Sequence, residues 1–160
     1  MIISGFQFRA SRKVLNLTLS QLHSETKVPQ GVLARLENKI GNLQKIQCKA
    51  DEADILFNYF LSHNLSFPDI SSLELVLPNK LISNKFLISR FQLIVARSIL
   101  RLSQRSLGNI VGLSHTMITR MEKLDNNQNI TLSSDILNVM LSVFSKNGIT
   151  LCNNNVVILE

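Results

Sequence analysis

Residues that could carry chemistry gather in one stretch, SQRSLGNIVGLSHTMITRMEK, residues 103–123. The stretch holds hydroxyl, amide, imidazole and cationic side chains, which donate or accept hydrogen bonds. The whole sequence has no metal-ligand cluster, no Ser/His/Asp spacing, no phosphate-cradling glycine loop and no paired carboxylates in an apolar setting. We therefore expect neither an enzyme nor a bound cofactor, metal or small-molecule ligand. What these side chains can bind depends on the elements that position them.

The composition is typical of a folded, helix-rich protein. Of the 160 residues 45% are hydrophobic, while Gly (6) and Pro (3) are scarce. Cys48 and Cys152 have no CxxC spacing, which argues against a disulfide scaffold or a zinc ribbon and fits a reducing cytosol. The N-terminal residues lack the apolar segment of a signal peptide, and no apolar run approaches the roughly 20 residues of a membrane span. We expect a cytoplasmic protein that makes no membrane contact.

Charge alternates along the chain. Residues 1–50 hold eight Lys/Arg against two Glu, and residues 85–123 hold seven against one. The segments that follow them, 51–84 and 124–160, carry net charges of −4 and −2. Two interpretations stay open at this point: solvated charged faces, or one cationic surface in each half that suits a polyanion.

The second half of the chain repeats the first at a constant numbering offset of 85. Identical pairs at this offset include Arg12–Arg97, Leu15–Leu100, Leu17–Leu102, Leu22–Leu107, Arg35–Arg120 and Glu37–Glu122. At an offset of 84, residues 63–67 align with residues 147–151. Because the matches fall on apolar spacings and a few charges, we interpret the halves as two copies of one fold. We place the boundary within 77–84, which predicts domains at 1–78 and 84–160.

Each copy is predicted to fold as four or five helices followed by a short β-hairpin, so the expected fold class is mostly α. In the second copy, periodicity predicts helices over about 86–101, 104–111 and 115–123, a fourth that ends before Gly148, and two strands within 149–160. Ser103 and Ser114 are the expected N-caps, and Gly112 is the expected left-handed residue between the second and third helices. The first copy repeats this plan, with Thr18 and Gln21 as a capping box.

Two short helices joined by a tight turn are typical of a helix-turn-helix. The second copy resembles the helix-turn-helix family of the lambda repressor and Cro type, also called the XRE family, over most of residues 90–151. The residues that carry the resemblance are Leu102, Ser103, Gln104, Leu107, Gly108, Gly112, Leu113, Ser114, Ile118, Thr119, Arg120, Met121 and Glu122. The resemblance implies two tandem lambda repressor-like domains in one chain.

By this resemblance, the third helix of the second copy enters the major groove of DNA. The expected base-facing residues are Ser114, His115, Thr116, Thr119, Arg120 and Lys123. The expected phosphate contacts are Arg97, Arg101, Gln104 and Arg105, and Gln104 would also brace the start of the third helix. Other interpretations remain open, since Arg120 and Glu122 could form structural ion pairs and His115 could be an ordinary exposed side chain.

The first copy departs from the family pattern around the turn. There Leu19, His23, Lys27 and Pro29 stand where the second copy has Gln104, Gly108, Gly112 and Ser114. Its expected base-facing residues are Gln30, Gly31, Ala34, Arg35 and Asn38, and its expected phosphate contacts are Arg9, Arg12, Lys13 and Thr18. We expect this copy to bind DNA as well, less specifically.

The function expected from the resemblance is a sequence-specific transcriptional regulator, most simply a repressor. Its two modules would act as a pseudo-dimer on adjacent operator half-sites of double-stranded DNA, and further association into a homodimer stays open. The alternative is an antitoxin or anti-activator whose first copy binds a protein partner, which the departures at His23, Lys27 and Pro29 motivate.

Overall fold

The structure is a computed structural model, in which residues 3–77, 87–153 and 155–160 are described. The backbone divides into two compact units, Met1–Val76 (unit 1) and Leu77–Glu160 (unit 2). The described residues form eight helices and small antiparallel sheets, and 53% of these residues are helical. The protein is therefore mixed α/β, and the expectation of a mostly α fold fits only roughly. The predicted domain limits at 78 and 84 lie outside the described residues.

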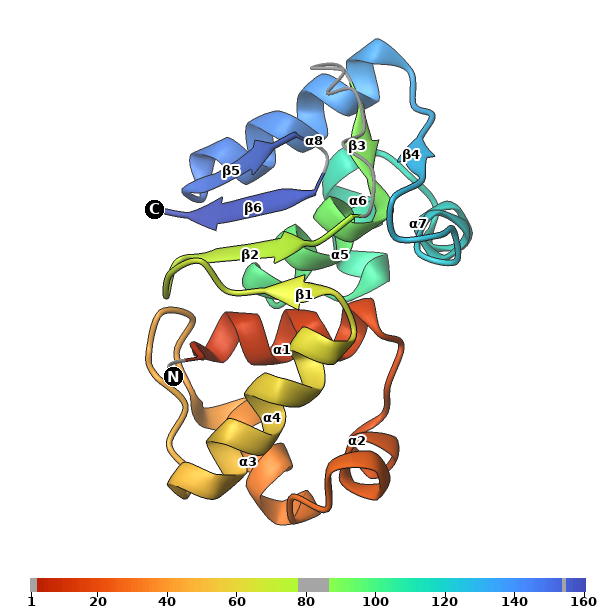
Figure 1. Cartoon of the computed structure of the whole chain (residues 1–160). Helices are drawn as coiled ribbons and strands as arrows, with labels where there is room; N and C mark the ends of the chain where they lie inside the picture. The colour runs from red at the N-terminus through yellow and green to blue at the C-terminus, as the bar shows by residue number, and fades with distance from the viewer. Residues whose placement is uncertain (1–2, 78–86, 154) are drawn as a thin grey trace. The chain divides into compact units, whose positions relative to one another are not determined.

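Unit 1 consists of four helices followed by a hairpin (Figure 1). Its elements are α1 (Gly5–Val14), α2 (Leu19–Thr26), α3 (Gln30–Lys39), α4 (Ala50–Ser62), β1 (Leu65–Ser66) and β2 (Ser72–Leu75). In the antiparallel hairpin, Leu65 lies opposite Leu75 and Ser66 lies opposite Glu74. The order of elements is the one predicted for the first copy.

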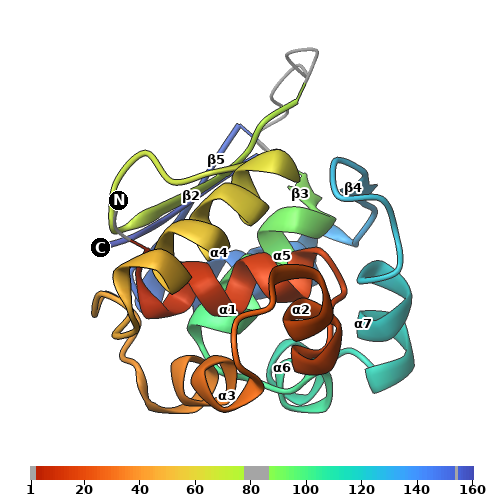
Figure 2. The same cartoon turned by 60° about the horizontal axis from the view of Figure 1, so that its bottom comes forward.

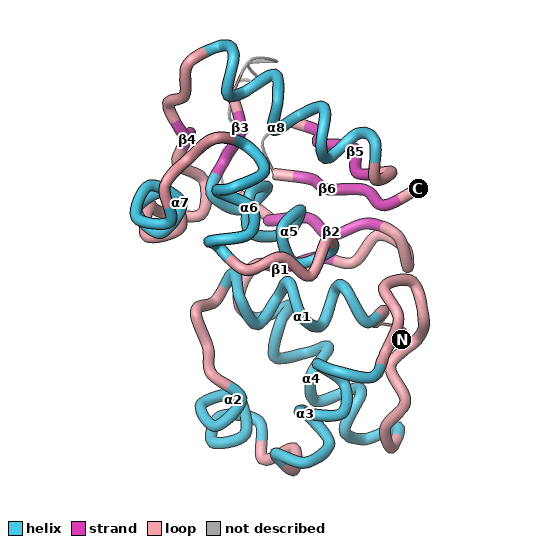
Figure 3. The backbone as a smooth tube through the Cα atoms, turned by 180° about the vertical axis from the view of Figure 1, so that it is seen from behind, coloured by secondary structure: helices cyan, strands magenta, loops and turns pink. Residues whose placement is uncertain are grey.

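Unit 2 has the same order of elements and one further strand pair (Figure 3). Its elements are β3 (Ile88–Ser89), α5 (Arg90–Ile99), α6 (Gln104–Val111), α7 (His115–Met121), β4 (Asn129–Ile130), α8 (Ser134–Lys146), β5 (Ile149–Cys152) and β6 (Val156–Leu159). The pair β3–β4, in which Ser89 lies opposite Asn129, was not predicted. Unit 1 has a single bridge at the corresponding place, between Ser4 and Lys45. Within the described ranges, no helix is long and apolar enough to cross a membrane.

Side-chain caps define where several helices begin. The hydroxyl oxygens of Ser103 and Ser114 accept hydrogen bonds from the backbone N–H groups of Ser106 (3.0 Å) and Met117 (3.2 Å). Such a cap satisfies one of the N–H groups that the first turn leaves without a partner, and it is worth about 1 kcal/mol. Both caps were predicted from the sequence and are confirmed. Gly112 takes the left-handed conformation, φ +76°, also as predicted.

Equivalent apolar residues in and between the second and third helices are buried in both units. They are Leu22, Val28, Leu33 and Leu36 in unit 1, and Leu107, Leu113, Ile118 and Met121 in unit 2. Full burial of one such side chain contributes about 1.5–3 kcal/mol. The short second and third helices are therefore held mainly by packing, since isolated helices of this length are unstable in water.

Equivalent hydrogen bonds connect equivalent elements in the two units. The first N–H of α1, on Gly5, donates to the Gln44 carbonyl (2.9 Å), and the first N–H of α5, on Arg90, donates to the Gln128 carbonyl (3.0 Å). The donors Gly5 and Arg90 are separated by the offset of 85, whereas the acceptors Gln44 and Gln128 are separated by the offset of 84. The loop after the third helix is thus one residue shorter in unit 2, which explains why the tails of the repeat align at the smaller offset.

A glutamine of the first helix ties that helix to the hairpin in each unit. Gln7 Nε2 donates to the Ser72 carbonyl (2.5 Å) in unit 1, and Gln92 Nε2 donates to the Val156 carbonyl (3.3 Å) in unit 2. The two glutamines are again separated by the offset of 85, and the two residues whose carbonyls accept are separated by the offset of 84. These matching contacts, made inside each unit, indicate that the sequence repeat corresponds to a repeated structure.

Candidate nucleic-acid interface

The turn between α6 and α7 depends on two glycines. The N–H groups of Gly112 and Leu113 both donate to the Gly108 carbonyl, the second at 2.8 Å. A Cβ atom on Gly108 would lie 2.5 Å from the Leu113 carbonyl oxygen. Cβ atoms in proteins essentially never approach another heavy atom this closely. Only glycine therefore fits at position 108 while α6 and α7 keep this close approach.

The predicted base-facing side chains of unit 2 lie at the surface of α7 and its ends. Ser114, His115, Thr116, Arg120 and Lys123 are exposed, and Thr119 is partly exposed. The opposite side of the helix is buried through Ile118 and Met121. α7 thus presents one polar face to solvent.

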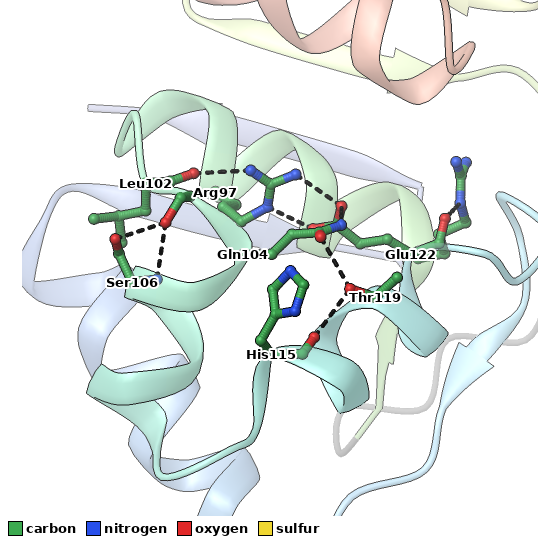
Figure 4. Close-up of polar contacts among 9 residues, drawn as sticks. Arg97, Leu102, Gln104, Ser106, His115, Thr119 and Glu122 are labelled. Carbon is green, nitrogen blue, oxygen red and sulfur yellow. Dashed lines mark hydrogen bonds and ion pairs between the residues drawn. The ribbon is translucent and has the colours of Figure 1, made fainter.

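A buried ion pair anchors the end of α7 to α5 (Figure 4). Arg97 donates from Nε and Nη2 to the two carboxylate oxygens of Glu122, at 2.5 and 2.7 Å, and from Nη1 to the Leu102 carbonyl at 2.8 Å. The Arg97 side chain is only 10% exposed. The structure uses the Arg97 guanidinium inside unit 2, which argues against the expected phosphate contact. For Glu122 the structural interpretation, left open by the sequence, is confirmed.

Gln104 connects this ion pair to the exposed face of α7 (Figure 4). Its Nε2 donates to Glu122 at 2.8 Å, and its Oε1 lies 3.0 Å from the hydroxyl oxygen of Thr119. Thr119 is one of the predicted base-facing residues. The expected brace therefore exists, although it supports the middle of α7 and not its first residues.

The remaining predicted phosphate contacts of unit 2 are exposed. Arg105 lies on the first turn of α6 and Arg101 follows α5, with a left-handed backbone at φ +54°. Both are near the N-terminal end of α6, beside Gln104 in the sequence. Their guanidinium groups are therefore available to solvent at the edge of the α6–α7 pair.

Unit 1 contains the same anchor in its own third helix. Arg12 donates from Nε and Nη2 to Glu37, at 3.1 and 2.5 Å, and from Nη1 to the Leu17 carbonyl at 2.6 Å. The Arg12 side chain is 14% exposed. As with its counterpart in unit 2, the internal pairing of Arg12 argues against the predicted phosphate contact.

Arg9 is the third predicted phosphate contact whose guanidinium is used inside its own unit. It is 3% exposed, and it donates to the Ile40 carbonyl at 2.8 Å and to the side-chain oxygen of Asn42. It therefore ties α1 to the loop after α3. The other two predicted phosphate contacts remain accessible: Lys13 is half-buried at the end of α1, and Thr18 is the exposed N-cap of α2, where its hydroxyl accepts from the Gln21 N–H at 3.1 Å.

The predicted base-facing residues of unit 1 lie on α3, which follows α2 after a short turn (Figure 2). Gln30, Gly31, Arg35 and Asn38 are exposed and Ala34 is partly exposed. Arg35 Nη2 donates to the Gln47 carbonyl at 3.0 Å, so this side chain leans toward the loop after α3.

Two lysines beside Arg35 were missed from the sequence. Lys45 and Lys49 line an open pocket of about 770 Å³ together with Arg35, Cys48 and Glu52. Burial and the Glu52 carboxylate raise the pKa of the Cys48 thiol, which therefore stays neutral at pH 7. At the equivalent positions of the repeat, unit 2 has Asn129 and Ser133. Unit 1 therefore carries two positive charges at positions where unit 2 has uncharged side chains.

The turn of unit 1 is built differently from that of unit 2. His23 stands where unit 2 has its tightly packed glycine, and its Nδ1 lies 2.8 Å from the Val28 carbonyl oxygen. The Val28 N–H donates to the Thr26 hydroxyl at 3.3 Å, while Lys27 takes the left-handed conformation at φ +61°. In unit 2 the N–H group equivalent to that of Val28, on Leu113, donates instead to the backbone carbonyl of Gly108.

No family model, curated protein or solved structure matches this chain. Across the parts of the chain that the structure describes, no group of His, Cys, Asp and Glu could hold a metal ion.

Proposed function

We propose that the protein is a sequence-specific DNA-binding regulator of transcription, most simply a repressor that occludes a promoter. Each unit is then a helix-turn-helix domain of the lambda repressor type, formed by α2 and α3 in unit 1 and by α6 and α7 in unit 2. The main support is the exposed polar face of α7, which Gln104 braces from inside unit 2. The major groove of B-DNA admits one α-helix, and donors and acceptors on its outer face can reach base edges.

Affinity in this proposal comes from exposed cations around the helix pairs. In unit 2 these are Arg101, Arg105, Arg120 and Lys123, and in unit 1 they include Arg35, Lys45 and Lys49. Cationic side chains that neutralise phosphates release condensed counterions, which makes binding strongly dependent on salt. Such contacts supply affinity without sequence information.

The two units would act on one duplex as a pseudo-dimer. Helix-turn-helix dimers bind half-sites whose centres lie one helical turn, about 34 Å, apart. The third helices present different side chains, Gln30 and Arg35 in α3 against His115 and Arg120 in α7. The two half-sites are therefore expected to differ in sequence.

The experiment is a selection from a pool of duplexes with a randomised centre, followed by binding isotherms at several salt concentrations. The proposal predicts an enriched sequence of two unlike halves. It also predicts that Arg105→Ser weakens binding to every duplex and lowers the salt slope by about one. Lys146→Ser is the matched control, because Lys146 is an exposed cation in the last turn of α8, away from α6 and α7 in the sequence. Recovery of no enriched sequence would refute the proposal.

A second candidate is an antitoxin or anti-activator in which α3 of unit 1 binds a protein partner. The observation that favours it is the absence in unit 1 of the brace found in unit 2, since Leu19 and Ala34 replace Gln104 and Thr119. Substitution of Gln30 and Arg35 separates the two. If Gln30→Ala and Arg35→Ala leave the affinity for the selected duplex unchanged, the partner-binding candidate is favoured.

A further inference from the structure

The buried ion pair determines which way the Gln104 amide faces. Glu122 accepts two hydrogen bonds from Arg97, so its carboxylate is ionised and can only accept. The group of Gln104 that lies 2.8 Å from Glu122 must therefore be the NH₂. The Gln104 carbonyl oxygen is then the atom that faces Thr119.

This orientation decides the direction of the hydrogen bond that Thr119 makes. Its hydroxyl oxygen lies 3.0 Å from Gln104 Oε1 and 3.0 Å from the His115 carbonyl oxygen (Figure 4). Both neighbours are acceptors, and a threonine hydroxyl has one proton. Whichever neighbour takes it, the proton is used inside unit 2. The exposed side of the Thr119 oxygen offers only lone pairs.

A hydroxyl that can only accept discriminates among bases. In the major groove, adenine presents the N6 amino group and cytosine the N4 amino group, whereas guanine presents the acceptors O6 and N7. We propose that Thr119 is a specificity-determining residue that accepts a hydrogen bond from the amino group of an adenine or a cytosine, and that it disfavours guanine at the same place. This inference rests on the proposed function, because it concerns the base that α7 faces.

Unit 1 serves as an internal comparison for this inference. The residue equivalent to Thr119 is Ala34, and the residue equivalent to Gln104 is Leu19. Neither side chain has a hydrogen-bonding group. The selection of an amino group is therefore expected only in the half-site that unit 2 contacts.

The test combines deletion of single functional groups in the DNA with substitution of Thr119. In the selected duplex, each adenine is replaced in turn by purine, which lacks the N6 amino group, and each cytosine by 2-pyrimidinone, which lacks the N4 amino group. Kd is measured for the wild-type chain, Thr119→Val and Thr119→Ala. We expect one position where loss of the amino group weakens wild-type binding about three- to tenfold, the range of one net hydrogen bond, and leaves both variants unaffected. Effects of the analogues on base pairing cancel in this comparison.

Thr119→Ser is the matched control, since it keeps the hydroxyl and should keep the sensitivity to the missing amino group. Circular dichroism confirms that each variant is folded. The inference is overturned if all chains respond alike at every position, or if the position coupled to Thr119 is a guanine. If no duplex is enriched in the selection at all, the proposed function itself fails, and that result is distinct from a selected duplex without coupling.

Discussion

Units 1 and 2 share the ion pair that anchors the third helix and differ in what supports its exposed face. Arg12–Glu37 and Arg97–Glu122 make the same set of hydrogen bonds, each including one backbone carbonyl. Only in unit 2 does the carboxylate also accept from a glutamine that reaches the outer face, Gln104. The ion pair therefore belongs to the scaffold, whereas the proposed function assigns the glutamine to recognition.

The units also differ in where their extra charge lies. Unit 1 has Lys45 and Lys49 beside its third helix, where unit 2 has Asn129 and Ser133. Phosphate contacts give affinity and base contacts give specificity. In the proposed function, unit 1 would therefore supply more of the affinity and unit 2 more of the sequence discrimination.

The largest expected effect tests the shared scaffold. Glu122→Ala leaves Arg97 buried without its carboxylate, and breaking a buried pair in this way costs about 3–5 kcal/mol. Glu37→Ala should cost less, because the side chains of its pair are 14% exposed, against 10% and 8% in unit 2. Urea unfolding followed by NMR signals of each unit measures both. An equal or larger loss for Glu37→Ala would show that the burial of the side chains does not set the cost of breaking the ion pair.

The next effect concerns the turn. Gly108→Ala forces a Cβ atom against the Leu113 carbonyl oxygen, so the helices must separate. We expect a loss of about 1–3 kcal/mol, the usual cost of overpacking. The matched change in unit 1, His23→Ala, removes one hydrogen bond to Val28 and should cost about 1 kcal/mol or less. Chemical denaturation of the two variants measures the difference, and equal losses would contradict the account of the turns.

A third prediction concerns the exchange of Gln104 in unit 2 and its counterpart Leu19 in unit 1. Gln104→Leu places the unit 1 residue in unit 2 and should reduce the preference for the selected duplex over a scrambled one by about 1 kcal/mol, the value of one hydrogen bond. The reverse exchange, Leu19→Gln, should add no preference because Ala34 offers no hydroxyl. Competition binding with both duplexes measures each preference. A gain from Leu19→Gln would mean that the brace acts without Thr119.

The smallest expected effect concerns the left-handed residue of each turn. Lys27 has φ +61° and Gly112 has φ +76°, a conformation that costs a residue with a side chain about 1 kcal/mol. Lys27→Gly should therefore raise the stability of unit 1 by up to about 1 kcal/mol, and Gly112→Lys should lower that of unit 2 by a similar amount. Thermal unfolding shows whether each substitution raises or lowers the stability. A loss of stability in Lys27→Gly would show that the Lys27 side chain stabilises unit 1 by more than its left-handed backbone costs.

Much of the scaffold could be predicted from the sequence because it depends on local or periodic signals. The caps at Ser103 and Ser114, the left-handed Gly112 and the buried apolar positions all follow from residue type and spacing. The strand pair β3–β4 could not be predicted, because two-residue strands have no usable periodicity and their partners stand far apart in the sequence.

Three of the predicted phosphate contacts rested on charge alone, and the structure places those side chains in internal contacts. Arg9, Arg12 and Arg97 are charged like any surface arginine, yet each is used inside its own unit. A signal was present for two of them: an arginine and a glutamate stand at the same spacing in both copies, as expected of a pair that the fold requires. Arg9 has no such repeated partner, because Ile94 occupies its equivalent position in unit 2.

The most direct test is an NMR titration of the ¹⁵N-labelled full chain with the selected duplex and with a scrambled one. If α7 discriminates bases more strongly than α3, the amide signals of residues 114–120 will differ more between the two duplexes than those of residues 30–38. Identical shifts of residues 114–120 with both duplexes, or no shift there at all, would contradict the account.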